Sequence, residues 1–261
     1  ENIGLLDENI GAFCDSTRDG IKGSALRAKE AGFINGAEGK EDEMLASVAA
    51  WCVNPYQAGG FEKVKAPSQI VTYVSAHDNH TLWDKLKETV VEENECLRLN
   101  KMAAAVYMTC QGTVFFLSGE EFARTKDGQD NTFKAPISLN RLDWEQAWEN
   151  RELVHYYQGL IALRKQLSGL CDKSKDSYKR ITDMWKEKDV VGFTVLNDEA
   201  SRWSQVKIIY NARKSSYKVK YLDDGWEILS DANDSWCWEK GVCADRHIEV
   251  APQSVLILGR K

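Results

Sequence analysis

Residues 70–84 read IVTYVSAHDNHTLWD, and the character of this stretch changes at its midpoint. The first part, IVTYVS, is an apolar run typical of a strand buried on both faces, as in a parallel sheet. The second part brings His77, Asp78 and Asn79 directly after that strand. Polar side chains at the C-terminal end of a parallel barrel strand project into the site. The alternative is an Asx turn that only ends the strand. The stretch therefore predicts a parallel sheet and a candidate site at its edge.

Outward from this stretch, strand-like and helix-like segments alternate. Each predicted strand is followed by a polar segment, such as DSTRDGIKGS at 15–24, which we interpret as a loop. Asn150 is a plausible cap and Gly169 a plausible C′ glycine of the third helix. The alternation favours βα units with a parallel sheet. The predicted strands are 10–14, 69–75 and 113–117, and the predicted helices are 41–53, 95–110 and 150–168.

After Gly169 the sequence changes to short β-type runs that are separated by turn residues. DVVGFTVLN, QVKIIYNAR, YKVKYLDDGWEIL and SVLILGR are typical of a small antiparallel β domain. We therefore expect two domains, one over residues 1–172 and one over 173–261, with the boundary in the polar run CDKSKDS.

The composition narrows the class of protein. Of 261 residues, 43% are hydrophobic and 28% are charged, which is typical of a soluble globular chain. The net charge is −6 without a basic block, which argues against nucleic acid and an anionic membrane as partners. No apolar run approaches the roughly 20 residues of a membrane span. No signal peptide is visible, and the lack of an initiator Met suggests an internal start.

The seven cysteines contain no CxxC pair, so a zinc site is not expected. We interpret them as free thiols that pack as small hydrophobic groups. Cys237 and Cys243 flank a predicted turn, and one bridge between them is the alternative. This usage favours a reducing, cytoplasmic compartment, although secretion stays undecided. His77 and His80 are three residues apart, but no third ligand has matching spacing, so no metal is predicted. The chain also lacks the GxSxG nucleophile elbow, so a Ser/His/Asp triad of that type is not supported.

Two further groups of polar residues follow predicted strands. Arg18 and Asp19 are interpreted either as an ion pair within their loop or as part of the site lining. The polar loop from Ser118 to Asp143 contains Asp130 and Asn131, which we interpret as substrate contacts above the mouth of a barrel. For Glu120 and Glu121, a structural ion pair is the interpretation that we favour.

Three segments together resemble type I pullulanases, in the alpha-amylase superfamily of glycoside hydrolases. FCDSTRDGIKGS resembles the segment after barrel strand six, YVSAHDNHTLWD the conserved region after strand seven, and FFLSGEEFARTKDGQDNTF with LNRLDW the strand-eight loop. The resemblance implies roughly the last three βα units of a TIM-type (β/α)8 barrel, followed by a C-terminal antiparallel β-sandwich. It covers nearly the whole chain.

The resemblance also implies a reaction, namely retaining hydrolysis of α-1,6 branch linkages in pullulan and branched α-glucans. Asp78 would be the carboxylate that stabilises the transition state, His77 a hydrogen-bond donor to the sugar, and Asn79 a contact to the neighbouring sugar. An α-glucan is the implied partner. No cofactor is predicted, and calcium sites cannot be read from the sequence.

The family's nucleophile Asp, in a GFRFD-type segment, and its acid Glu have no counterpart in this sequence. The match assigns neither role to Glu120, Glu121 or Asp130. We therefore expect the chain to be the C-terminal part of a longer enzyme, whose missing barrel half is a further partner. Two alternatives stay open: a non-catalytic α-glucan-binding fragment, and another superfamily member such as an isoamylase or a branching enzyme. The residues TLWD at 81–84, shortly after HDN, favour the pullulanase type.

Overall fold

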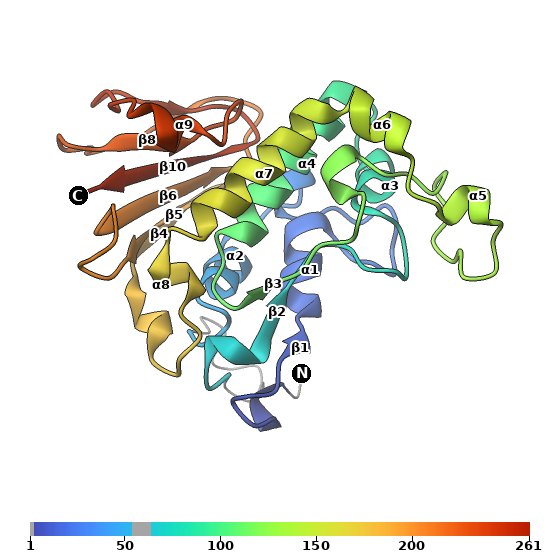
Figure 1. Cartoon of the computed structure of the whole chain (residues 1–261), viewed down its shortest axis with the longest axis horizontal. Coiled ribbons are helices and arrows are strands. Elements are labelled where there is room, and N and C mark those ends of the chain that lie inside the picture. The colour runs from blue at the N-terminus through green and yellow to red at the C-terminus, as the bar shows by residue number, and fades with distance from the viewer. Residues whose placement is uncertain (1–2, 54–63) are drawn as a thin grey trace.

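The first part of the chain contains a three-stranded parallel sheet, which Figure 1 shows in the lower middle of the molecule, near the N-terminus. Its strands are β1 (Ala12–Phe13), β2 (Ile70–Thr72) and β3 (Thr113–Val114), in the order β1-β2-β3. Both pairings are parallel, as predicted. The computed structural model describes residues 3–53 and 64–261. Each strand is shorter than predicted because the chain leaves the sheet early to form the loops at the C-terminal ends of the strands.

Helices lie between and after these strands. The four longest are α4 (Glu93–Met108), α7 (Arg151–Arg164), α1 (Asp15–Lys22) and α2 (Glu41–Val48). Shorter α-helices are α3 (Leu82–Lys87), α5 (Ile137–Asn140), α6 (Trp144–Glu149), α8 (Ser168–Cys171) and α9 (Cys237–Lys240). The 3-10 turns are η1 (Ile3–Leu5), η2 (Phe33–Asn35), η3 (Pro67–Gln69), η4 (Glu120–Phe122) and η5 (Ser177–Arg180). Within the described residues, none of these helices has the length and apolar character that a membrane span requires.

The segment predicted as a loop at 15–24 is instead mostly helix α1, so this prediction was wrong. Its apolar signal is weak, but Thr17 and Ile21 are four residues apart and both are fully buried on one face. Asp15 adds a negative charge to the first turn, where the helix dipole favours it. Gly23 ends the helix at φ 92°, and a Cβ there would lie 1.9 Å from the carbonyl oxygen of Glu30. Only glycine fits this position.

The predicted C-terminal signal of the third helix was also wrong. Helix α7 ends at Arg164, and Gly169 lies within the separate short helix α8. Asn150 is at the N-cap position of α7, as predicted, but its side chain makes no capping hydrogen bond; its Nδ2 donates to the carbonyls of Phe122 and Gln146. Arg164, the last residue of α7, donates through its guanidinium to carbonyls outside the helix, including those of Met108 and Leu170.

The second part of the chain contains a five-stranded antiparallel sheet with the order β4-β5-β6-β10-β8. These strands are β4 (Ile181–Glu187), β5 (Val190–Leu196), β6 (Gln205–Asn211), β8 (Glu227–Ser230) and β10 (Ser254–Arg260), and a small sheet pairs β7 (Tyr217–Lys218) with β9 (Glu249–Val250). All four predicted β-type runs contain strands. Strand β4 was missed because a bulge between Thr182 and Trp185 interrupts its alternation. The proposed bridge is absent: Cys237 and Cys243 are free thiols.

The five-stranded sheet buries both of its faces. One face contributes Phe193, Ile208 and Ile257 to the same hydrophobic cluster as Leu99 and Leu160 of helices α4 and α7. The other face lies under the β7–β9 sheet, in a cluster that includes Trp226 and Val250. In Figure 1 this sheet accordingly lies alongside α7 and α4. The core is therefore shared between the helices and the antiparallel sheet.

Candidate active site

A hollow of about 390 Å³ lies at the C-terminal ends of the parallel strands. His77, Asp78 and Asn79 line it, as predicted from their position directly after β2. Arg18 of α1 lines it too. The strand order brings α1 and the loop after β2 to the same edge of the sheet, because β1 and β2 are parallel neighbours.

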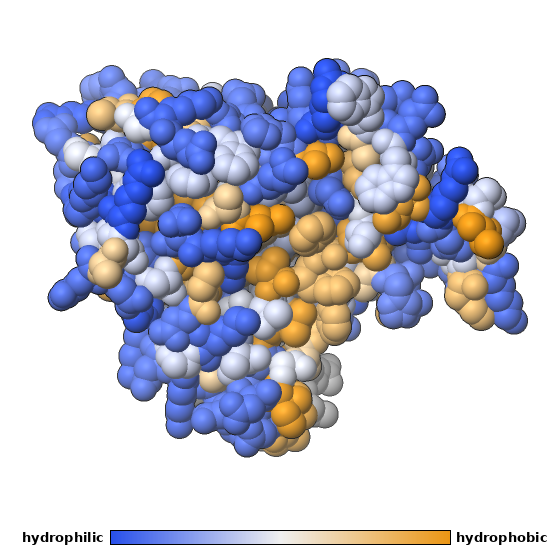
Figure 2. All heavy atoms as spheres, viewed as in Figure 1, coloured by the Kyte–Doolittle hydropathy of each residue, from blue (hydrophilic) through white to orange (hydrophobic). Residues whose placement is uncertain are grey.

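Three aromatic rings form the floor of the hollow, one from the end of each parallel strand. The ring of Phe13 lies 4.8 Å from that of Tyr73 and 5.1 Å from that of Phe115, in edge-to-face arrangements. Phe13 is 49% exposed. Figure 2 shows apolar surface in the middle of the molecule, in the region where Figure 1 draws the parallel strands.

The two central polar residues are open to a ligand. Nε2 of His77 lies 3.2 Å from Oδ2 of Asp78, and the side chains are 87% and 73% exposed. Asn79 has φ 64°, a left-handed conformation that Asn tolerates better than most residues. The turn therefore presents a carboxylate and an imidazole together at the rim of the hollow.

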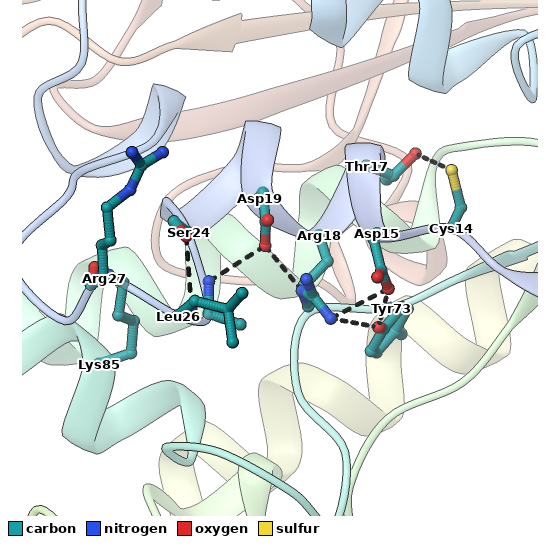
Figure 3. A network of polar contacts seen from close by, with 11 residues as sticks. Cys14, Asp15, Thr17, Arg18, Asp19, Ser24, Leu26, Arg27, Tyr73 and Lys85 are labelled. Carbon is teal, nitrogen blue, oxygen red and sulfur yellow. Dashed lines mark hydrogen bonds and ion pairs between the residues drawn. The ribbon is translucent and has the colours of Figure 1, made fainter. Parts of the chain in front are cut away.

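Arg18 connects α1 to the floor, as Figure 3 shows. Its Nε donates to Asp19 at 2.7 Å, and its Nη1 donates to Asp15 at 3.0 Å and to the hydroxyl of Tyr73 at 2.8 Å. The Tyr73 hydroxyl in turn donates to Asp15 at 2.7 Å. Burial alone lowers the pKa of Arg18, but the neighbouring Asp19 and Asp15 raise it above its ordinary value. The guanidinium therefore stays charged and fixes the Tyr73 ring.

Asp84, the last residue of the quoted stretch, joins two loops. Its buried carboxylate accepts hydrogen bonds from the hydroxyls of Thr81 and Thr125 and from the backbone N–H of Lys126. Thr81 also caps α3 by accepting from the backbone N–H of Asp84. The loop after β3 is thereby attached to the helix that follows the His77–Asn79 turn.

Two more contacts join the same loops. Nζ of Lys126 donates to the carbonyl of His77 at 3.1 Å. The ring of His80 contacts the carbonyl of Gly128 through Nε2 at 2.9 Å. Burial lowers the pKa of the Lys126 ammonium. The backbone that carries Asp78 is therefore held from the side of the β3 loop.

Glu120 lies fully enclosed behind this turn. Its carboxylate accepts hydrogen bonds from Ser75 at 2.5 Å, from Tyr107 at 2.8 Å and from Tyr157 at 3.2 Å. Burial raises its pKa to about 7, although the three hydroxyls favour the charged form. Because Ser75 is three residues before Asp78, Glu120 anchors the strand end from which the turn departs. It pairs with hydroxyls rather than with a cation, so the predicted structural ion pair was wrong.

Lys22 is a buried cationic side chain that lines the hollow. Burial, together with the nearby positive charges of Lys85 and Arg18, lowers the pKa of its amine to about 7. Among the residues that the structure describes, none forms a hydrogen bond or ion pair with its Nζ. The hollow is therefore lined by an amine that is only partly protonated at neutral pH.

The other predicted residues lie further from the hollow. Asp130 and Asn131 are exposed on the loop after β3 and do not line it. Asp19 is set behind Arg18 and accepts a backbone hydrogen bond from Ala25. The described residues contain no cluster of three or more side chains suited to bind a metal ion.

Sequence reasoning did not single out Tyr73, Ser75, Asp84, Lys22 or Lys126. For Asp84 a signal exists, since Thr81-x-x-Asp84 has the capping-box spacing that marks the start of a helix. For the others the sequence offers none, because their roles depend on residues distant in the chain.

The chain is similar in sequence and in structure to known proteins. No family model matches the chain. It is 30% identical over 223 residues to a pullulanase of Bacillus subtilis (strain 168), a match that covers 82% of this chain and 30% of that protein. Among solved structures, a pullulanase from Paenibacillus barengoltzii in complex with maltohexaose and α-cyclodextrin matches with a TM-score of 0.80 and 31% identity, over 96% of this chain and 38% of the other.

A pullulanase from Anoxybacillus sp. LM18-11 in complex with maltotetraose matches with a TM-score of 0.84 and 26% identity, over 97% of this chain and 35% of the other. The chain thus spans about a third of the length of these relatives.

Proposed function

Because the chain is a homologue of the pullulanases and covers part of a longer pullulanase chain, we propose that it forms one wall of a debranching active site. The reaction is hydrolysis of α-1,6 linkages in pullulan and branched α-glucans, with retention of configuration. The observation that carries this proposal is the position of His77, Asp78 and Asn79 around the hollow at the strand ends. Two of the solved relatives were studied with maltooligosaccharides bound.

Asp78 acts in this proposal through its charge. Cleavage of a glycosidic bond passes through an oxocarbenium-like state, and a fixed carboxylate next to that developing cation lowers the barrier. His77, whose Nε2 lies 3.2 Å from Oδ2 of Asp78, donates a hydrogen bond to the same sugar. Asn79 contacts the neighbouring sugar. The nucleophile and the general acid belong to the rest of the longer enzyme.

Arg18 and Asp19 support the site in this proposal. Arg18 lines the hollow and holds the Tyr73 ring, and Asp19 keeps Arg18 in place through their 2.7 Å contact. Asp130 and Asn131, on the loop that Asp84 attaches to α3, contact the glucan beyond the rim of the hollow. Their exposure supports this role, because they are accessible to a long substrate.

We assign the three parallel strands to the last roughly three βα units of a (β/α)8 barrel, over residues 1–172, and residues 173–261 to a C-terminal β-sandwich domain. The aromatic face formed by Phe13, Tyr73 and Phe115 supports the barrel, because the inner face of such a barrel is filled with side chains. The remaining barrel strands are then the partner of this face.

The test is Asp78→Asn in the natural full-length polypeptide that contains this chain, assayed on pullulan by reducing ends and product size. We expect kcat to fall by about 10²–10³, with little change in glucan binding, since the lost charge acts on the transition state. Asp176→Asn is the matched control, because Asp176 has only a surface pair with Lys179. Near-normal turnover of Asp78→Asn would exclude the role. Glucan binding without any cleavage by the unmodified protein would favour a purely binding function.

A further inference from the structure

A groove of about 1150 Å³ lies away from the candidate active site. Helices α6 and α7 form one wall, and the segment 233–240, which includes α9, forms the other. None of the residues assigned to the active site lines this groove. It therefore requires a separate explanation.

Two tryptophans stand out on the first wall. Trp144 and Trp148 are four residues apart on α6, so they share one face of that helix, and each is 71% exposed. A solvent-facing helical position normally carries a polar residue. Two large aromatic side chains at adjacent exposed positions mark a binding surface.

The second wall holds a third tryptophan in a fixed orientation. Nε1 of Trp236 donates to the carbonyl of His155 at 3.0 Å. The Trp236 ring stacks on the ring of His155, with centroids 5.5 Å apart and an angle of 23°, and on Trp238 at 5.7 Å and 25°. The groove therefore contains an aromatic side chain whose orientation is already fixed, so a ligand would not have to order it.

The two walls are attached to one another by close packing at Gly159 of α7. A Cβ at this position would lie 2.0 Å from Oγ of Ser235, so only glycine permits this approach. Ser235 donates to the carbonyl of Tyr156 at 2.7 Å, and the Tyr156 hydroxyl donates to the carbonyl of Asp231 at 2.9 Å. The groove thus has a defined shape that these contacts maintain.

The polar groups of the groove favour an uncharged ligand with many hydroxyls. Glu152, Gln158 and Asn233 line it, and among the described residues none bonds to their side chains. The charges balance: the cations Lys101, Arg151 and Lys240 face the anions Glu152, Asp234 and Glu239. The groove has no excess of positive charge that would attract a nucleic acid or an acidic peptide.

A pyranose matches this combination. Its C–H groups carry partial positive charge and pack on the negative face of an indole, while its hydroxyls bond to carboxylates and amides. We propose that this groove is a second binding site for an α-glucan chain, formed by Trp144, Trp148 and Trp236 and remote from the hollow at Asp78. The inference rests on the proposed function, which supplies the identity of the sugar.

The test is the double variant Trp144→Ala/Trp148→Ala of the natural full-length polypeptide, made in an Asp78→Asn background so that cleavage of the ligand is slow. Retardation in gels that contain glycogen and calorimetric titration with maltoheptaose measure binding. We expect the affinity for glycogen to fall about tenfold, because exposed aromatic anchors dominate such surfaces. Tyr221→Ala, at an exposed aromatic outside the groove, is the matched control and keeps the parental affinity.

Unchanged glycogen affinity in the double variant overturns the proposal. A lower melting temperature with unchanged affinity also overturns it, because the groove is then covered by polypeptide. Hydrolysis is measured separately, with Asp78 intact. If the unmodified protein cleaves no pullulan but the double variant still loses glycogen binding, the proposed function fails and this second site stands.

Discussion

Oγ of Ser75 donates a 2.5 Å hydrogen bond to Oε2 of Glu120, although the two residues are 45 positions apart in the chain. This bond joins the end of β2 to the turn after β3. It also places a carboxylate where no solvent reaches it, and burial raises its pKa from the ordinary value of 4.5 to about 7. The link that orders the Asp78 turn is therefore sensitive to pH.

The first prediction concerns the stability that Glu120 contributes. Between pH 4.5 and about 7, the folded chain holds more protons at Glu120 than the unfolded chain does. The contribution of Glu120 to the free energy of unfolding is therefore present at acid pH and is lost as the pH rises through 7. The total loss is roughly 3 kcal/mol. Glu120→Gln removes this dependence, so its free energy of unfolding, relative to that of the parent, should rise between pH 5 and pH 8.

Urea unfolding at both pH values measures this difference. Glu149→Gln, on the exposed surface of α6, is the control and should follow the parent at each pH. The same slope in Glu120→Gln as in the parent would contradict the prediction.

Lys22 should show the opposite sign. In the folded chain the pKa of Lys22 is lowered from 10.5 to about 7. Below pH 7 the amine is charged in both states, so the whole free-energy cost of burying the ammonium is subtracted from the stability of the fold. That cost is relieved as the pH rises from 7 towards 10.5. Lys22→Met should therefore stabilise the protein at pH 6, with a smaller gain at pH 9. Thermal unfolding at the two pH values checks this, with the exposed Lys29→Met as control. A loss of stability at pH 6 would contradict it.

Arg18 should not be replaceable by lysine. The guanidinium contacts Asp19, Asp15 and Tyr73 at once, whereas an ammonium lacks the planar fork that these three directions require. We expect both Arg18→Met and Arg18→Lys to lose about 1–3 kcal/mol of unfolding free energy. Chemical denaturation measures the loss. Exposed Arg141→Met provides the comparison, and full stability of Arg18→Lys would show that charge alone suffices.

Asp84→Asn should loosen the loop after β3. Asparagine has a single side-chain oxygen, so it cannot accept from Thr81, Thr125 and the N–H of Lys126 together. A donor left unpaired in a buried site costs about 1–3 kcal/mol. Hydrogen exchange should become faster at residues 123–128 than in α4. Asp127→Asn, exposed on the same loop, is the control; equal protection in Asp84→Asn and the parent would contradict this role.

The sequence predicted the order of strands and helices because periodicity is local. Alternating strands and helices with an apolar face, such as α4, can be recognised within a short window. Helix α1 was missed because Ile21 is the one strongly apolar side chain among its buried residues, which also include Thr17, Gly20 and Lys22. The C-terminal end of α7 was misplaced because Gly169, which was interpreted as its end signal, belongs to the separate short helix α8.

The site was predicted only where its residues are consecutive. His77, Asp78 and Asn79 follow a strand directly, so their place at the rim follows from the direction of β2. The supports of the site are contacts between distant positions, such as Tyr73 with Asp15 or Ser75 with Glu120. Serine and tyrosine are common in many environments, so nothing local distinguishes these partners from surface residues.

The position of β10 within its sheet has a consequence for biosynthesis. Strand β10 follows all the other strands of this sheet in the chain, yet it lies between β6 and β8. A nascent chain on the ribosome cannot complete the sheet until β10 has emerged from the exit tunnel. Until then the apolar faces of α4 and α7 that pack against this sheet stay partly exposed. We therefore expect chaperones to bind the growing polypeptide. A premature stop codon before residue 254 should thus send the product to proteolysis.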